Sequence, residues 1–307
     1  MNARLKHHHF NRLTPFWDFV VTTILIIAAL LTLMPVVLVV IISFSSADSI
    51  AMNGYRFIPS GWSFEAYRAV LKSGKQILDS YIVTIAHTTL GTISSLTVMS
   101  MFAFALSQKK FKARRFLTFF TFFTMLFSGG LVPSYIINVR YLNLYDNFLI
   151  YILPSLVSAY HVIILRTFII TTIPDTMIEA GKIDGASDFT VFVKIVLPLF
   201  KPGLATIALF NVVGRWNEWF TGMLYISNPK LIPLQTMLTK IQQNIDFLKQ
   251  SIGSTVGSEE MLEALKRMPS DSTRMATTII SVLPVMLIYP FFQRYFIKGL
   301  TIGSIKG

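Results

Sequence analysis

The stretch from Phe19 to Ser43 reads FVVTTILIIAALLTLMPVVLVVIIS and contains no charged residue. A helix rises about 1.5 Å per residue, and roughly 20 apolar residues are needed to cross a bilayer core of about 30 Å. Within hydrocarbon every backbone polar group of a lone segment must be bonded inside that segment, which only a helix achieves. The stretch therefore predicts a membrane-spanning helix.

The rest of the chain repeats this pattern. Its 307 residues are 53% hydrophobic and 14% charged, whereas soluble domains are about 25% charged. The sequence thus predicts an all-α, polytopic membrane protein that forms a single transmembrane domain over residues 1–307. Six apolar spans are expected, at about 17–43, 80–106, 116–137, 148–170, 203–226 and 276–296.

The N-terminal segment also has features of a signal peptide, because Arg4, Lys6 and Arg12 precede the first apolar run. Ser43, Ser45, Ser46 and Ala47 are small enough for a cleavage site. The run is far longer than the roughly 7–15 residues of a cleavable apolar region, however. A retained first helix is the prediction.

The net charge of +12 does not predict a nucleic-acid partner. The Lys and Arg residues lie in loops between apolar spans, where anionic lipid headgroups and the positive-inside rule account for them. The chain has no cysteine, which excludes disulfides, thiolate metal sites and cysteine nucleophiles.

The two short loops of the chain predict its orientation. Loop 107–115 contains five Lys and Arg residues, whereas loop 138–147 contains only Arg140. Placing the first loop in the cytoplasm puts both termini there as well. The external loops are then 44–79 and 227–274, and the largest cytoplasmic loop is 171–202.

The external segment 237–248 has apolar residues at helical spacing. It predicts an amphipathic helix that lies against the membrane or a partner. The residues concerned are Met237, Leu238, Ile241, Ile245 and Leu248.

The cytoplasmic loop 171–202 carries the signals of two short helices. Pro174 and Asp175 suit the first turn of a helix, and Asp184-Gly185 suits its end, because glycine adopts the left-handed conformation readily. A second helix is expected with Phe189, Phe192 and Val196 on one face, ending at Leu197-Pro198.

This loop combines small residues with carboxylates. The small residues permit close backbone approach, and the carboxylates could bind a basic partner. Two interpretations stay open from these residues alone: a docking element for another protein, or an ordinary loop with solvated acidic residues. The small residues are Ala180, Gly181, Gly185 and Ala186, and the carboxylates are those of Glu179, Asp184 and Asp188.

The spacing in this loop resembles the EAA motif of the membrane subunits of ABC importers. Glu179-Ala-Gly181 is followed after three residues by Gly185, and after nine more by Ile195-x-Leu197-Pro198. The chain departs from the motif at Gly181, where alanine is commoner, and this change should loosen the helix slightly.

Other stretches are similar to the carbohydrate-uptake permeases, in the branch associated with oligosaccharides and polysaccharide breakdown products. The resemblance covers nearly the whole chain. It implies a multi-pass subunit of the bacterial plasma membrane that works with a second homologous permease, an ABC ATPase dimer and an extracellular solute-binding protein to import a carbohydrate. The matching stretches are Phe127–Ser134, Arg166–Phe168, Trp216–Trp219 and Gly299–Gly307.

The resemblance also implies which residues transmit the action of the ATPase. In the family the EAA helix sits in a cleft of the ATPase, so Glu179, Ala180, Gly181, Asp184, Gly185 and Ala186 are the expected coupling residues. The tail also reaches between the ATPases in close relatives, which implies contacts by Gly303, Ser304 and Lys306. A frayed terminus is the alternative for the tail.

The chain contains no phosphate-binding loop of the form G-x-x-x-x-G-K-[ST], because Gly253-Ser-Thr-Val-Gly257 lacks the lysine. No cofactor is therefore expected in this chain, and ATP and magnesium would be bound by the partner ATPase. Neither clustered metal ligands nor a G-x-S-x-G nucleophile turn is present, so a non-catalytic subunit is predicted. His7, His8 and His9 could bind metal, but three consecutive histidines beside basic residues are more typical of a solvated tail.

Polar residues within spans are candidates for a translocation path, because they are costly in lipid and usually face a cavity. The expected substrate-path residues are Asn211, Trp216, Asn217, Glu218 and Trp219, since sugars are held by aromatic stacking and hydrogen bonds. Alternatively, the two tryptophans form an interfacial belt, and Arg215 pairs with Glu218 at helical spacing. Further intramembrane polar residues are His87, Tyr160, His161 and Arg166.

Three other functions remain open at this point. The first is an ABC permease for a different solute, such as a peptide, an amino acid or glycerol phosphate. The second is an ion-coupled transporter that works alone. The third is a membrane enzyme, which the absence of a catalytic constellation disfavours. The basic residues weakly favour an acidic sugar such as a uronide.

Overall fold

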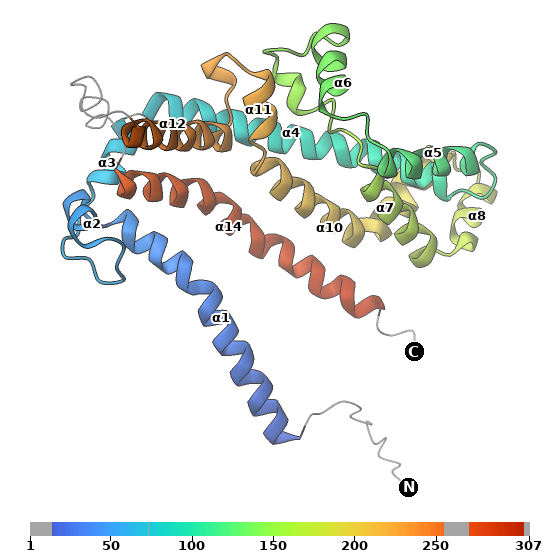
Figure 1. Cartoon of the computed structure of the whole chain (residues 1–307). Helices are drawn as coiled ribbons and strands as arrows, with labels where there is room; N and C mark the ends of the chain where they lie inside the picture. The colour runs from blue at the N-terminus through green and yellow to red at the C-terminus, as the bar shows by residue number, and fades with distance from the viewer. Residues whose placement is uncertain (1–13, 73, 255–269, 304–307) are drawn as a thin grey trace. The chain divides into compact units, whose positions relative to one another are not determined.

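The computed structural model describes residues 14–72, 74–254 and 270–303, and most residues in these ranges are helical. The described residues contain no strand, apart from an isolated bridge between Ser45 and Trp62. The all-α prediction is therefore confirmed. The α-helices are α1 (Pro15–Ser43), α2 (Ala47–Asn53), α3 (Glu65–Lys72), α4 (Gly74–Ser107), α5 (Arg114–Leu126), α6 (Leu131–Ile136), α7 (Ala159–Thr172), α8 (Asp175–Ile183), α9 (Asp188–Val191), α10 (Leu197–Trp216), α11 (Phe220–Tyr225), α12 (Leu234–Ser254) and α14 (Asp271–Gly303) (Figure 1).

Shorter helical pieces connect several of these helices. Two have π geometry, Ile137–Tyr141 and Phe192–Val196, and two are 3₁₀ turns, Phe148–Tyr151 and Pro229–Leu231. By length and composition, four helices can cross a membrane, or up to six if each of two bent helix pairs forms one span. The six expected spans fit within this range.

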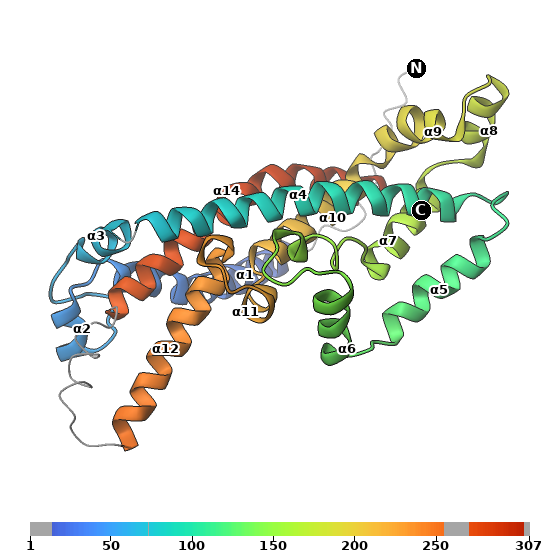
Figure 2. The same cartoon turned by 90° about the horizontal axis from the view of Figure 1, so that it is seen from above.

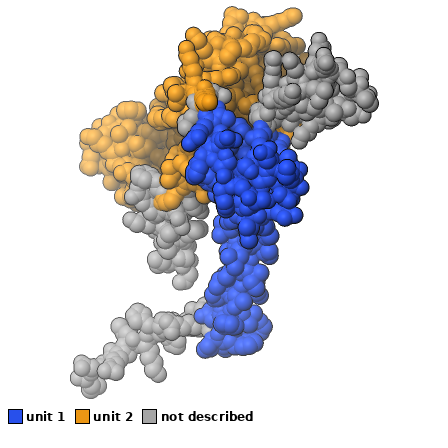
Figure 3. Space-filling view, turned by 90° about the vertical axis from the view of Figure 1, so that its left-hand side faces the viewer, with its two compact units in different colours: residues 1–71, 269–279 blue, residues 72–268, 280–307 orange. Residues whose placement is uncertain are grey.

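The chain divides into two compact units, which are coloured separately in Figure 3. The first contains residues 1–71 and 269–279, and the second contains residues 72–268 and 280–307. In the first unit, the hydroxyl of Ser272 donates to the carbonyl of Ser45 at 2.7 Å. Helix α1 begins at Pro15, which suits a first helical position. Its apolar side chains are exposed in the isolated chain, as expected of a helix that meets lipid.

The second unit has α4 as its long axis, and α5, α7 and α8 gather at the end of α4 that leads into α5 (Figures 1 and 2). One apolar core lies at this end and joins side chains of α4, α7, α8, α9 and α10. A second core joins α4, the turn Phe148–Tyr151, α11 and α12. The helix predicted at 237–248 is confirmed as part of α12, but Met237, Leu238 and Ile241 pack in or against the second core of the chain itself. The expected contact of this helix with the membrane or a partner stays a prediction.

Three of the expected spans are interrupted. The span predicted at 116–137 bends by 113° between α5 and Leu131–Tyr141, because Gly130 has φ +86° and Pro133 follows it. The span predicted at 148–170 is regular only in α7, since Pro154 cannot donate a helical hydrogen bond. The span predicted at 203–226 begins earlier, at Leu197, and breaks after Trp216.

Irregular backbone at membrane depth is tolerated only where protein buries it and satisfies its polar groups. Side chains of α4 do so for the segment between residues 151 and 159. The hydroxyl of Ser95 donates to the carbonyl of Leu156 at 2.7 Å, and the amide of Ser158 points to the sulfur of Met99 at 3.4 Å. The break at Pro154 is therefore fixed by contacts with a helix about 60 residues earlier.

Candidate functional site

The predicted helix at the start of loop 171–202 is confirmed as α8. Pro174 is its N-cap, Asp175 lies in its first turn, and it ends at Ile183. Gly185 follows with φ +82°, a left-handed conformation in which residues with a Cβ are strained. The side chain of Lys109, in the loop after α4, forms an ion pair with Asp175.

The second helix of this loop does not end at Leu197-Pro198 as predicted. It begins at Asp188, capped by the hydroxyl of Ser187, and continues through a π-helical turn into α10. The amide that Pro198 lacks would have bonded four residues back, and a π turn, whose bonds span five residues, precedes this position. The end of loop 171–202 and the candidate span that follows are thus one continuous helical element.

Helix α8 has a buried face and an exposed face. Ile178 and Gly181 are buried against the first core, whereas Ile183 is 85% exposed. A Cβ on Gly181 would lie 2.6 Å from Cδ1 of Ile195, so this glycine brings α8 close to the turn before α10. The four remaining expected coupling residues comprise the exposed Glu179, Ala180 and Asp184 and the half-buried Ala186.

The first core connects α8 to the spans. Ile178 of α8 and Val191 of α9 share it with Phe200 of α10, Leu165 of α7 and Phe104 of α4. Packed cores are dense and transmit displacement rather than absorb it. The parts of α4, α7 and α10 that line this core should therefore move together with α8. A force applied to the exposed face of α8 therefore reaches α4 and α10.

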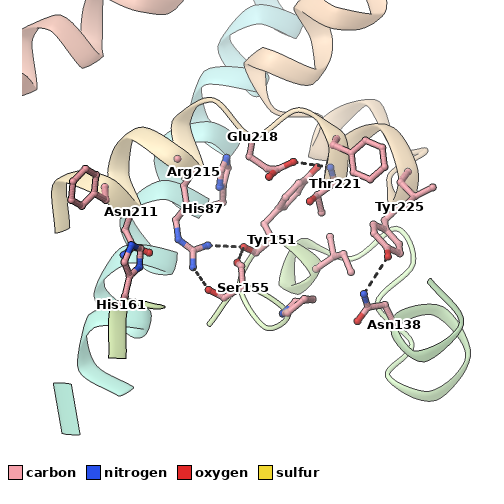
Figure 4. A pocket seen from close by; sticks show the side chains of 16 residues that line it. His87, Asn138, Tyr151, Ser155, His161, Asn211, Arg215, Glu218, Thr221 and Tyr225 are labelled. Carbon is pink, nitrogen blue, oxygen red and sulfur yellow. Dashed lines mark hydrogen bonds between the residues drawn. The ribbon is translucent and has the colours of Figure 1, made fainter. Parts of the chain in front are cut away.

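A second candidate site is a cavity of 480 Å³ between α4, α7, α10, α11 and the two irregular segments. Figure 4 shows polar side chains from several of these elements directed around it. The volume falls in the range of small-molecule sites, and a few convergent polar groups on an otherwise apolar wall are typical of such sites. Its labelled polar lining comprises His87, Asn138, Tyr151, Ser155, His161, Asn211, Arg215, Glu218, Thr221 and Tyr225.

The structure brings together only part of the expected substrate path. Asn211 and Glu218 line the cavity, and the other three residues do not. Trp216 is buried, its Nε1 donates to the carbonyl of Ser281 at 2.9 Å, and its ring contacts Tyr81 edge-on. Asn217 and Trp219 are exposed outside the cavity.

Arg215 does not form the suggested ion pair with Glu218. Its guanidinium donates to the carbonyls of Tyr151 and Ser155 at 2.8 and 3.0 Å, and the carboxylate of Glu218 accepts the amide of Thr221 at 2.9 Å (Figure 4). Each charged group stabilises a break in the helical structure, because those backbone groups have no helical partner there. Arg215 thus positions one wall of the cavity.

Several residues that line the cavity were not among the expected substrate-path residues. His87 of α4 is 1% exposed, stacks on Tyr151 with ring centroids 5.1 Å apart, and its Nε2 has no hydrogen-bond partner among the described residues. Asn138 donates to the hydroxyl of Tyr225 at 3.2 Å. The sequence signal for His87 was a polar side chain within an apolar span, whereas Asn138 begins the predicted loop 138–147 and carried no such signal. Their convergence depends on the tertiary fold.

Two groups of expected residues have little or no described structure. Gly303 is the last residue of α14, whereas Ser304 and Lys306 lie outside the described residues. His7, His8 and His9 also lie outside them. The expectations for the tail and the histidines stay predictions.

The fold and the two sites define a class: a multi-pass helical membrane protein with a helical element outside its spans and a polar cavity among them. Residues 97–302 match the family described as "Binding-protein-dependent transport system inner membrane component". The chain belongs to this family, the permease subunits of ABC transport systems. This agrees with the resemblance found in its EAA-like loop.

Individual relatives cover nearly the whole chain. The Polygalacturonan/rhamnogalacturonan transport system permease protein YtcP of Bacillus subtilis (strain 168) is 35% identical over 97% of this chain and 99% of its own length. Protein LplC of the same organism is 34% identical over 90% of each chain. A solved structure described as a bacterial ABC transporter involved in the import of the acidic polysaccharide alginate matches with a TM-score of 0.77 and 32% identity, over 94% of this chain and 100% of that chain.

Proposed function

We propose that this chain is one of two membrane subunits of an ATP-driven importer that brings an oligosaccharide of acidic sugars into the cytoplasm. The relatives that act on polygalacturonan and alginate support the substrate class, since both polymers consist largely of uronic acids. The net charge of +12 is compatible with an acidic cargo. Uptake would occur by alternating access, with rigid-body rocking of the helices.

The observation that carries the mechanism is the two-sided construction of α8. Its inner face shares a core with α4, α7 and α10, while Glu179 and the 85% exposed Ile183 face outward. An exposed apolar residue beside a carboxylate, on a helix that is itself firmly packed, suits a site gripped by another protein. We assign this face to an ABC ATPase, which would bind ATP and magnesium because this chain has no phosphate loop.

The remaining partners follow from the same proposal. A second, homologous permease subunit would complete the pathway, because four to six spans of one chain make a poor closed conduit. An extracellular solute-binding protein would deliver the sugar, and the 480 Å³ cavity would contact it in the membrane. The chain would lie in the bacterial plasma membrane, with loop 107–115, α8 and both termini in the cytoplasm.

The test of ATPase docking is Glu179→Ala in the assembled transporter. Uptake should fall about tenfold or more while insertion is retained, because one member of a desolvated charged contact is removed. The matched control is Glu65→Ala, which removes an exposed carboxylate of α3 that the proposal places outside the cell. Normal uptake and normal ATPase copurification with Glu179→Ala would refute the docking site.

The test of the substrate is uptake by cells that either carry or lack the gene. Labelled oligogalacturonates should enter only when the gene is present, and neutral arabino-oligosaccharides and glycerol phosphate should be unaffected. Uptake of glycerol phosphate alone would favour the alternative of a permease for a non-sugar solute. Uptake by vesicles that contain only this chain, driven by an ion gradient, would favour an ion-coupled transporter.

A further inference from the structure

A second hollow, with a volume of 410 Å³, lies where the last turn of α4 meets α8 and α9. We call it the α4–α9 groove. It is separate from the cavity among the spans, because the two share no lining residue. It lies at the end of α4 toward which α8 and α9 gather (Figure 2), and α4 is a candidate membrane span that ends at Ser107. The groove is therefore at the boundary between the span and the polar loops.

The floor of the α4–α9 groove is aromatic. Phe104 and Phe192 are buried with ring centroids 5.3 Å apart. Phe189 and Phe111 line the same groove and remain 64% and 38% exposed. Exposed phenylalanine rings at the end of a membrane span gain free energy when an acyl chain packs on them, because apolar surface is removed from water.

The rim of the groove is cationic. The amino group of Lys182 lies 2.6 Å from the carboxylate of Asp188, so this charge is compensated. Lys110 also lines the groove, is exposed, and takes part in no salt bridge among the described residues. It belongs to loop 107–115, which contains five Lys and Arg residues. The groove thus combines an apolar floor with an unneutralised positive charge at its edge.

We propose that the α4–α9 groove binds one anionic phospholipid, with an acyl chain on the phenylalanines and the headgroup phosphate at Lys110. Basic pockets beside membrane helices at a bilayer surface bind anionic headgroups in this way. A bound lipid would contact α4, α8 and α9 together, the elements that share the first core. The lipid would thereby stabilise one arrangement of the coupling helix relative to the span.

Binding of lipid to the purified full-length chain tests the proposal. The chain in a neutral detergent is titrated with phosphatidylglycerol or phosphatidylcholine, and the bound lipid is counted by native mass spectrometry. Phosphatidylglycerol should bind with a stoichiometry of one and more tightly than phosphatidylcholine. Equal binding of the two lipids, or equal competition by soluble glycerol phosphate, would overturn the proposal. The measurement requires no transport, so its outcome does not depend on the proposed function.

Two variants locate the site. Lys110→Gln should weaken phosphatidylglycerol binding about fivefold, the effect of one lysine near an anionic surface. Lys112→Gln is the matched control, because it removes the same charge from the same exposed loop outside the groove and should change binding less than twofold. If both variants lost phosphatidylglycerol binding equally, the lipid would be attracted to the charge of the whole loop, and the assignment of the headgroup to Lys110 would be overturned.

A third variant tests the apolar floor without changing charge. Ala105→Phe fills the groove from α4 and should remove the tightly bound lipid while the chain keeps its elution volume in size-exclusion chromatography. Retained binding would overturn the assignment. Assembly with the ATPase should leave the lipid bound. Complete release of lipid on assembly would assign the groove to the ATPase instead.

Discussion

Arg215 lies directly over Gly91, so that a Cβ on residue 91 would be 2.4 Å from Nη1 of the guanidinium. The guanidinium is held there by hydrogen bonds to the carbonyls of Tyr151 and Ser155. Three distant parts of the chain, α4, the irregular segment after Tyr151 and α10, are thereby joined beside the cavity (Figure 4). Gly91 is needed because the guanidinium could move away from a Cβ only by giving up these two hydrogen bonds.

The first prediction concerns Gly91→Ala. The added methyl group collides with a side chain fixed at two points, so we expect a loss of about 1–3 kcal/mol in the free energy of unfolding. Thermal unfolding of the purified protein in detergent measures it. Gly214→Ala on α10 is the control, because a Cβ there meets nothing within 4 Å and alanine favours helix by up to about 1 kcal/mol. An equal loss in both variants would refute the steric explanation.

The second prediction concerns the coupling between the two positions. Arg215→Met removes two charged donors from backbone carbonyls and should destabilise the protein by about 3 kcal/mol. In that background Gly91→Ala should cost almost nothing, because the flexible thioether is not anchored and can move aside. A double-mutant cycle measured by thermal unfolding should therefore be non-additive by about 1–3 kcal/mol. Strict additivity would show that the two residues do not interact.

The features that the sequence predicted depend on local signals. The apolar run of α1 and the start of α8 at Pro174-Asp175 need only nearby residues. The breaks within the spans could not be placed in the same way. Gly130 and Pro133 indicate a weak point, but the bend of 113° and the course of the chain after Pro154 depend on contacts with α4 that no local pattern encodes.

The same distinction holds for the cavity. Asn211 and Glu218 were predicted as polar residues on one span, and they do line it. Trp216 was predicted beside them for its aromatic ring, yet its indole bonds to Ser281, 65 residues away. His87 reaches the cavity from α4. Which polar residues of different spans converge is decided by helix packing, and a single sequence does not contain that information in readable form.

The third prediction compares two asparagines of the expected substrate path. The amides of Asn211 and Asn217 each donate to the carbonyl four residues earlier, at 3.0 and 2.8 Å, but only Asn211 lines the cavity. If the cavity contacts sugar, Asn211→Ala should raise the KM for uptake about 3–10-fold, the effect of one lost hydrogen bond. Asn217→Ala should leave KM unchanged. The reverse order of effects would place the substrate path elsewhere.

The fourth prediction concerns Gly185, which is exposed and has φ +82°. A Cβ on this residue would meet no atom within 4 Å, so only the backbone conformation restricts it. Gly185→Val should cost about 1–2 kcal/mol by opposing the left-handed conformation, and the end of α8 should change direction to relieve it. Gly185→Asn is the matched control, because asparagine enters this conformation more readily than other residues with a Cβ.

The measurement for Gly185 is made on the assembled transporter, as the number of ATP molecules hydrolysed per sugar imported. If α8 is the docking site for the ATPase, Gly185→Val should raise this ratio, because a redirected α8 would no longer transmit closure of the ATPase to α10 through their shared core. Gly185→Asn should keep the ratio close to that of the parent protein. If valine and asparagine raised it equally, the size of the side chain rather than the turn would matter, and the exposed surface at Gly185 would itself be part of the contact with the ATPase.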